Sequence, residues 1–228
     1  MDNDSHKARL IVTTSTNISK SLFWSLVRFN KNWVDSLKLR LPCDNVPVPK
    51  RAMRLPNAPR DYRSGIHRGV DFFANWGTPV RSVAEGVVVR SDLHYEEVPA
   101  DFRENLLKAT TKVGHTPSDI FNSVLLGKSV FLDHGFDLIP GFRTISIYAH
   151  LSHIEKEIVP GAIVKRGELL GKSGNTGMRE STIGSKAGSH LHWEMILQKG
   201  EQEIYLGKGM SNPELYDCLL YTSDAADE

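Results

Sequence analysis

Apolar and polar positions follow two different periods along this chain. Between residues 21 and 39, apolar side chains recur at the three- and four-residue spacing of a helix. The members of this stripe are Phe23, Leu26, Val27, Trp33, Val34 and Leu37. Polar residues at positions 28, 31 and 32 interrupt it, so the segment is too short and too charged to span a bilayer. We expect a helix that packs on the domain or on a partner. The alternative is a helix that lies on a membrane surface with its aromatic side chains buried.

Further along, short apolar stretches separated by glycine turns predict an antiparallel β architecture. The alternation is clearest in residues 143–151, where one face would carry Ile145, Ile147 and Ala149. The other face would carry Thr144, Ser146, Tyr148 and His150. This pattern places His150 at the end of a strand, on its polar face.

Two segments depart from the strand pattern. Residues 92–126 contain helical spacing and a Thr-Pro helix start at 116–117, which predicts an α-helical insertion between two strands. Residues 41–63 are rich in proline and arginine, which disfavours helix and central strand and predicts an extended wrap or linker. The predicted organisation is an N-terminal extension with a helix (1–40), this proline-rich segment (41–63) and a mainly β domain (64–217).

Composition narrows the range of functions. The 228 residues are 40% hydrophobic and 24% charged, as in one globular domain with extensions. A formal net charge of +1 gives no large basic surface that would argue for nucleic acid. Cys43 and Cys218 lie far apart and form no CxxC motif, so they indicate neither a zinc knuckle nor a disulfide framework. The nine histidines are better candidates for chemistry.

The two ends of the chain lie outside the predicted β domain. Residues 1–20 are polar and lack the layout of a signal peptide. Residues 218–228 can be back-translated into a transposon-type sequencing adapter, so we expect an assembly artefact there. On this hypothesis the natural protein continues beyond Asp217 in a different sequence. The alternative is a natural polar tail.

Histidines and one carboxylate gather in three separate stretches. His190 and His192 occupy positions i and i+2 of a predicted strand and would therefore point into one site. His67 and Asp71 are four residues apart with Gly69 between them, and a bend at the glycine would let both reach one ion. Each stretch alone also fits an ordinary role, as an incidental histidine pair or as a surface histidine beside a capping aspartate.

Together with His150, these stretches supply enough ligands for a metal centre. Two histidines and one carboxylate, with one coordination position open, are typical of a catalytic zinc site rather than a structural one. Zinc would polarise a scissile carbonyl and lower the pKa of a bound water to about 7. The remaining histidines could take up the water's proton and stabilise the oxyanion.

The order of these motifs resembles that of the M23 family of zinc metallopeptidases, also called LytM or lysostaphin-type endopeptidases. The resemblance spans residues 65–197 and is carried by HRGVD (67–71), YAHL (148–151) and GSHLHWE (188–194), with the turn motifs WGTPV, AEGVVV, LDHG and KRGELLGKSGNTG in family order. It implies an antiparallel β-sandwich-like peptidase domain. It also implies that His67, Asp71 and His192 bind Zn2+, while His190 acts as general base and His150 stabilises the tetrahedral intermediate.

The resemblance further implies hydrolysis of stem peptides or cross-bridges of bacterial peptidoglycan. Such a substrate places the protein outside the cytoplasmic membrane: in the periplasm, in the cell wall or secreted. The alternative is a non-catalytic LytM-type module that binds the cell wall or activates an amidase, but every expected ligand is present here. A carbohydrate-binding or structural β domain is a third interpretation. The insertion at 92–126 and a long loop at 177–188 depart from the family pattern and would reshape the substrate groove.

Overall fold

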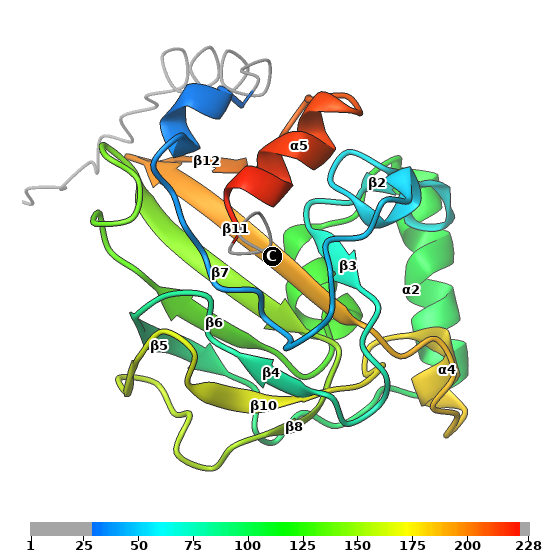
Figure 1. Cartoon of the computed structure of the whole chain (residues 1–228). Helices are drawn as coiled ribbons and strands as arrows, with labels where there is room; N and C mark the ends of the chain where they lie inside the picture. Colours follow the sequence, from blue (N-terminus) through cyan, green and yellow to red (C-terminus); the bar gives the residue numbers. More distant parts are fainter. Residues whose placement is uncertain (1–28, 224–228) are drawn as a thin grey trace, which may run out of the picture.

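The computed structural model describes residues 29–223 and is built mainly from antiparallel β-sheets (Figure 1). The largest sheet has seven strands, in the order β12-β11-β7-β6-β5-β9 with β3 beside β11. A second sheet has the order β4-β10-β8, and a small ribbon joins β1 to β2. The strands are β1 (Pro59–Arg60), β2 (Gly65–Ile66), β3 (Val70–Phe72), β4 (Pro79–Arg81), β5 (Gly86–Ser91), β6 (Val130–Asp133), β7 (Arg143–Ala149), β8 (Leu151–Ile154), β9 (Ile163–Val164), β10 (Leu169–Ser173), β11 (Leu191–Lys199) and β12 (Gln202–Tyr205).

The main hydrophobic core joins the two larger sheets. Val80 of β4, Leu151 of β8 and Leu170 of β10 are fully buried in it. Leu132 of β6 and Met195 of β11 meet them from the large sheet. Burying one face of each sheet against the other removes both apolar faces from water. The prediction of a mainly β, antiparallel, sandwich-like fold is confirmed.

The opposite face of the large sheet is covered by helices. These are α2 (Ala100–Val113), α3 (Ser118–Ile120) and the π-helical turn η4 (Phe121–Leu125), all within the predicted insertion at 92–126. Phe121 and Leu125 form a second core with Ile147 of β7 and Ile196 of β11. The insertion therefore packs on the sheet surface beside which the histidines gather.

The predicted N-terminal helix falls partly outside the described residues. From residue 29 onward the described segment contains one 3-10 turn, η1 (Lys31–Val34). Phe29, Val34 and Leu37 are buried in the main core, so this part packs on the domain. No helix among residues 29–223 is long and apolar enough to cross a membrane.

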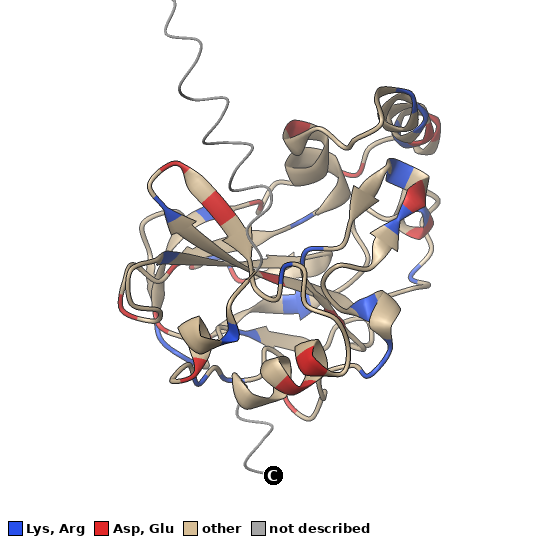
Figure 2. Cartoon of the chain, turned by 90° about the horizontal axis from the view of Figure 1, so that it is seen from above, with Lys and Arg blue, Asp and Glu red and all other residues tan. Residues whose placement is uncertain are grey.

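The proline-rich segment also packs on the domain. Cys43, Val48 and Leu55 lie in the main core, and the segment contains the short 3-10 helices η2 (Ala52–Arg54) and η3 (Asp61–Arg63). Basic and acidic residues are interspersed along the described chain (Figure 2).

The C-terminal helix α5 (Glu214–Tyr221) runs through the start of the suspected adapter sequence. Leu219 is buried in the main core, and Ser223 forms an isolated bridge with Leu39. The remaining helix, α4 (Arg179–Thr182), lies in the long loop. The adapter origin of residues 218–228 stays a prediction.

Candidate metal centre

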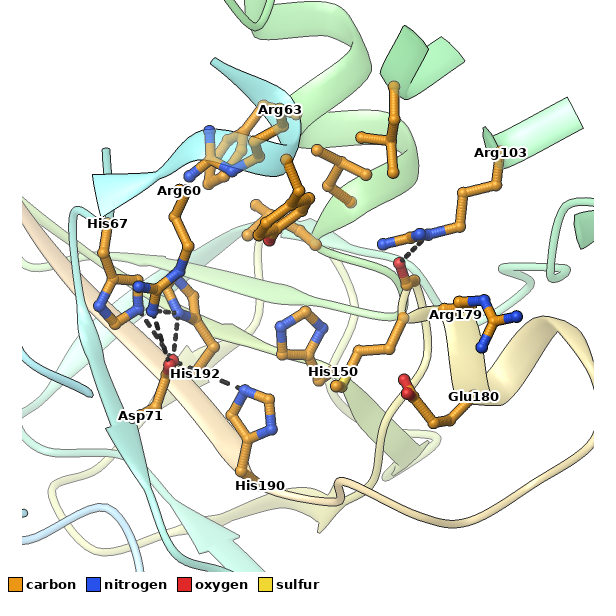
Figure 3. A pocket seen from close by; sticks show the side chains of 17 residues that line it. Arg60, Arg63, His67, Asp71, Arg103, His150, Arg179, Glu180, His190 and His192 are labelled. Atoms are coloured by element: carbon orange, nitrogen blue, oxygen red, sulfur yellow. Dashed lines mark hydrogen bonds and ion pairs between the residues drawn. The ribbon is translucent and has the colours of Figure 1, made fainter. Parts of the chain in front are cut away.

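Strand pairing brings His67, Asp71 and His192 together. β3 pairs with β11 so that His192 lies opposite Asp71, and His67 precedes β3 by three residues (Figure 3). Asp71 Oδ1 lies 2.9 Å from His67 Nε2 and 2.8 Å from His192 Nδ1. The two ring nitrogens are 3.0 Å apart. Within the described chain these three residues form a group whose ligand atoms could hold one metal ion.

The outer nitrogens of both imidazoles are already engaged. His67 Nδ1 lies 2.9 Å from the Leu55 carbonyl oxygen, and His192 Nε2 lies 2.8 Å from Glu194 Oε1. Carbonyl and carboxylate oxygens only accept, so both outer nitrogens carry protons and donate. In the neutral rings, the inner nitrogens then point lone pairs at each other and at an anionic oxygen. Three acceptors converging in this way need a cation between them, and the donor set fits a metal ion.

Burial and mutual contacts shift the pKa values of these three groups. Burial opposes ionisation of Asp71, but its contacts with His190, His192 and His67 hold its pKa well below the usual range. Burial lowers the pKa of His67. Burial also opposes protonation of His192, but hydrogen bonds to Asp71 and Glu194 raise its pKa to about 9. A proton and a metal ion would therefore compete for the Nδ1 lone pair of His192.

A buried ion pair supports His192 from behind. Glu194 is fully buried, and its second oxygen, Oε2, lies 3.1 Å from an Arg68 Nη atom. Burial would raise the pKa of Glu194, but its contacts with His192 and Arg68 lower it. Our sequence analysis assigned no role to either residue. The sequence signal that could have found them is their place inside the quoted motifs: Arg68 is the second residue of HRGVD, and Glu194 ends GSHLHWE two residues after His192.

Gly69 has a different role from the one predicted. We expected it to permit a backbone bend between His67 and Asp71, but its φ does not lie in the left-handed region. Instead, a Cβ at this position would lie 2.2 Å from the carbonyl oxygen of Trp193. Glycine is required because β3 passes directly against the backbone of β11.

His150 and His190 lie on the open side of this group (Figure 3). Their ring centroids are 4.8 Å apart, and His190 Nε2 is 3.5 Å from Asp71 Oδ1. His190 Nδ1 donates to the Gly188 carbonyl, and His150 Nδ1 donates to the Thr176 carbonyl, each at 2.8 Å. In the neutral rings, both Nε2 atoms therefore offer lone pairs to the pocket.

The predicted reason for the orientation of His150 is wrong. The face that carries Thr144, Ser146 and Tyr148 is buried against the main core and is not a polar surface. His150 reaches the pocket because its φ of 60° places it in the left-handed region between β7 and β8. Its backbone N–H donates to Leu126 of the insertion. Non-glycine residues in this conformation are uncommon and gather at functional sites.

Burial, and then the neighbouring imidazoles of His190 and His192, hold the pKa of His150 well below its usual value.

Arg60 was also missed by the sequence analysis. Its Nη2 lies 3.1 Å from Asp71 Oδ2, the carboxylate oxygen that faces away from the two imidazoles. Both side chains are only 13% exposed. Arg60 belongs to the proline-rich segment that we expected to be a wrap or linker, and it holds Asp71 so that only one oxygen points into the group.

The site opens into a pocket of about 480 Å³. Its lining includes five residues of the insertion (Arg103, Leu107, Phe121, Leu125, Leu126) and four of the long loop (Gly177, Met178, Arg179, Glu180). Arg103 Nε donates to the Gly177 carbonyl at 2.9 Å, which ties α2 to the loop. Both departures from the family pattern therefore shape the walls of this pocket.

Known proteins with similar sequences are peptidases. A model of peptidase family M23 matches residues 109–204, a range that includes His150, His190 and His192 but begins after Asp71. An L-Ala–D-Glu endopeptidase of Bacillus subtilis is 27% identical over 142 residues, which is 60% of this chain and 32% of that protein. An uncharacterized metalloprotease of Haemophilus influenzae is 30% identical over 128 residues, 56% of this chain and 18% of that protein. The chain thus spans a third or less of each of these relatives.

Among solved structures, the catalytic domain of the antimicrobial peptidase lysostaphin from Staphylococcus simulans is 21% identical. The match covers 74% of this chain and 86% of that domain, with a TM-score of 0.36.

Proposed function

The chain resembles peptidase family M23, and from this premise we propose that it is a zinc-dependent endopeptidase that hydrolyses peptide bonds in bacterial peptidoglycan. The observation that carries the proposal is the convergence of His67 Nε2, His192 Nδ1 and Asp71 Oδ1 within 3.0 Å of one another. Two imidazoles and one carboxylate are a common ligand set of catalytic zinc sites, in which the fourth coordination position is left for water or substrate.

Zinc held by these three residues would polarise the scissile carbonyl and acidify the attacking water. The chain's own groups do the rest. His190 Nε2 is next to the ligand Asp71 and would accept the water's proton as general base. His150, whose ring centroid is 4.8 Å from that of His190, would stabilise the developing oxyanion. Glu194 and Leu55 hold the ligand imidazoles in the tautomers that point their lone pairs at the metal.

The substrate assignment rests on the relatives. One is named for cleavage of an L-Ala–D-Glu bond, and another is the peptidase lysostaphin. A peptidoglycan substrate requires action outside the cytoplasmic membrane, in the periplasm, in the cell wall or after secretion. A stem peptide or a cross-bridge is the proposed target.

The experiment is metal analysis of the full chain, together with mass spectrometry of peptidoglycan digested by it. We expect about one zinc per chain and new peptide termini, and both should be lost in His192→Ala. His153→Ala is the matched control, because His153 is a histidine on the exposed surface of β8. Continued cleavage by His192→Ala would overturn the proposal. Stoichiometric zinc without cleavage would instead support the non-catalytic LytM-type module.

A further inference from the structure

Two arginines occupy the wall of the pocket that faces away from Arg60. Arg103 comes from helix α2 of the insertion, and Arg179 is the first residue of α4 in the long loop. Figure 3 shows both guanidinium groups on the opposite side of His150 from the His67–Asp71–His192 group. Neither arginine belongs to a motif that carries the family resemblance.

Arg103 is held in a fixed orientation. Its Nε donates to the Gly177 carbonyl at 2.9 Å, and the Gly177 N–H donates to Glu97 Oε2 at 2.9 Å. Arg103 and Glu97 thus hold the carbonyl and the N–H of the same residue, Gly177, at the start of the loop. This arrangement uses one of the five N–H donors of Arg103 and leaves its two terminal nitrogens to the pocket.

The positive charge of the two arginines is not neutralised by an ion pair. Among residues 29–223, no carboxylate lies within ion-pair distance of Arg103 or Arg179, although Glu180 lines the same pocket. Of the other two pocket arginines, Arg60 pairs with Asp71, whereas Arg63 is buried and donates to the Ile66 carbonyl and to Thr116 Oγ1.

Arg103 is half-buried and Arg179 is exposed, and apolar side chains form part of the wall of their pocket. Leu107, Phe121, Leu125 and Leu126 line the same pocket. A guanidinium beside apolar walls attracts an anion more strongly than one surrounded by water. Arginine also presents paired N–H groups that match the two oxygens of a carboxylate.

We propose that Arg103 and Arg179 form a carboxylate-binding subsite, so that the chain prefers peptides with a free carboxylate near the scissile bond. This inference rests on the proposed function for its substrate class. The carboxylate can be an acidic side chain or a C-terminal carboxylate. The insertion and the long loop, the two departures from the family pattern, would then together set the specificity of the enzyme.

The test uses the full chain and fluorescently labelled pentapeptides based on Ala-Glu-Lys-Ala-Ala. One pair differs by glutamate against glutamine, and the other by a C-terminal carboxylate against a carboxamide. Equilibrium binding and kcat/KM are measured for the wild type and for the double variant Arg103→Gln with Arg179→Gln. The control is Lys108→Gln with Lys112→Gln, which removes the same charge from the exposed side of α2.

In the wild type we expect at least one acid peptide to bind about tenfold more tightly than its amide partner. The ratio should fall to near one in the arginine variant and persist in the lysine variant. The pair that shows the preference identifies the source of the carboxylate. Because Arg103 also holds the loop, a purely structural effect would weaken acid and amide peptides equally and would overturn the inference. So would a wild-type ratio near one. Preferential binding would support the subsite even if none of these peptides is cleaved, and the proposed peptidase activity is then decided separately by the peptidoglycan digest.

Discussion

His192 lies directly opposite Asp71 in the pairing of β11 with β3, and its Nδ1 is 2.8 Å from Asp71 Oδ1. The register between these two strands therefore sets the distance between the ligand Asp71 of β3 and the ligand His192 of β11. Two further side chains orient these ligands. Glu194 contacts Nε2 of His192, and Arg60 contacts Oδ2 of Asp71.

Glu194→Gln should weaken metal binding. The carboxylate fixes the tautomer of His192 and increases the basicity of its Nδ1, and loss of such a partner typically costs 10–100-fold in metal affinity. Zinc affinity is measured by competition with a chelating dye. Glu203→Gln is the control, because this glutamate is exposed on the neighbouring strand β12. Equal zinc affinities in the wild type and in Glu194→Gln would show that the buried carboxylate does not affect metal binding by His192.

The pH dependence of metal binding should follow the proton on His192. Its pKa of about 9 in the metal-free protein means that zinc must displace a proton at lower pH. Apparent zinc affinity should therefore fall about tenfold per pH unit between pH 9 and 7. Calorimetric titration across this range measures the slope. A flat profile would contradict a protonated His192.

His192 should also make the stability of the metal-free protein depend on pH. Zinc affinity rises with pH, whereas this stability should fall. The folded pKa of His192 is raised above the unfolded value of 6.5, so its stabilisation is fully present below pH 6.5 and is lost as pH rises towards 9. The Tm of chelator-treated protein should fall over this window. His192→Gln should remove the pH dependence, and an unchanged slope in that variant would contradict the assignment.

Short spacing marked His190 with His192 and His67 with Asp71 as candidate ligands, whereas the set His67, Asp71 and His192 was implied by the resemblance to family M23. The sequence did not predict Arg60 or Arg68, since their contacts join segments whose relative placement depends on packing of the whole domain. His150 illustrates a second limit. Simple alternation places it on the wrong face, and only its left-handed backbone brings it into the pocket.

Gly69→Ala should strongly destabilise the domain. The added Cβ would lie 2.2 Å from the Trp193 carbonyl oxygen, so β3 would have to separate from β11. We expect a loss of more than about 2 kcal/mol in the free energy of unfolding. Gly184→Ala serves as control, because its Cβ would meet nothing within 4 Å and only its positive φ is unfavourable. Similar losses in urea unfolding of the two variants would show that close strand approach is not the reason for Gly69.

Leu219→Ala tests whether the C-terminal segment belongs to the folded domain. Leu219 is 3% exposed in the main core, and truncation of a buried leucine costs about 2–5 kcal/mol. Urea unfolding should show this loss, whereas truncation of the exposed Tyr221 to alanine on the same helix should have little effect. A chain that ends at Asp217 should be destabilised at least as much as Leu219→Ala if the segment is native to the fold. If instead both changes leave the unfolding transition where it was, residues 218–223 contribute nothing to the core, as the adapter hypothesis requires.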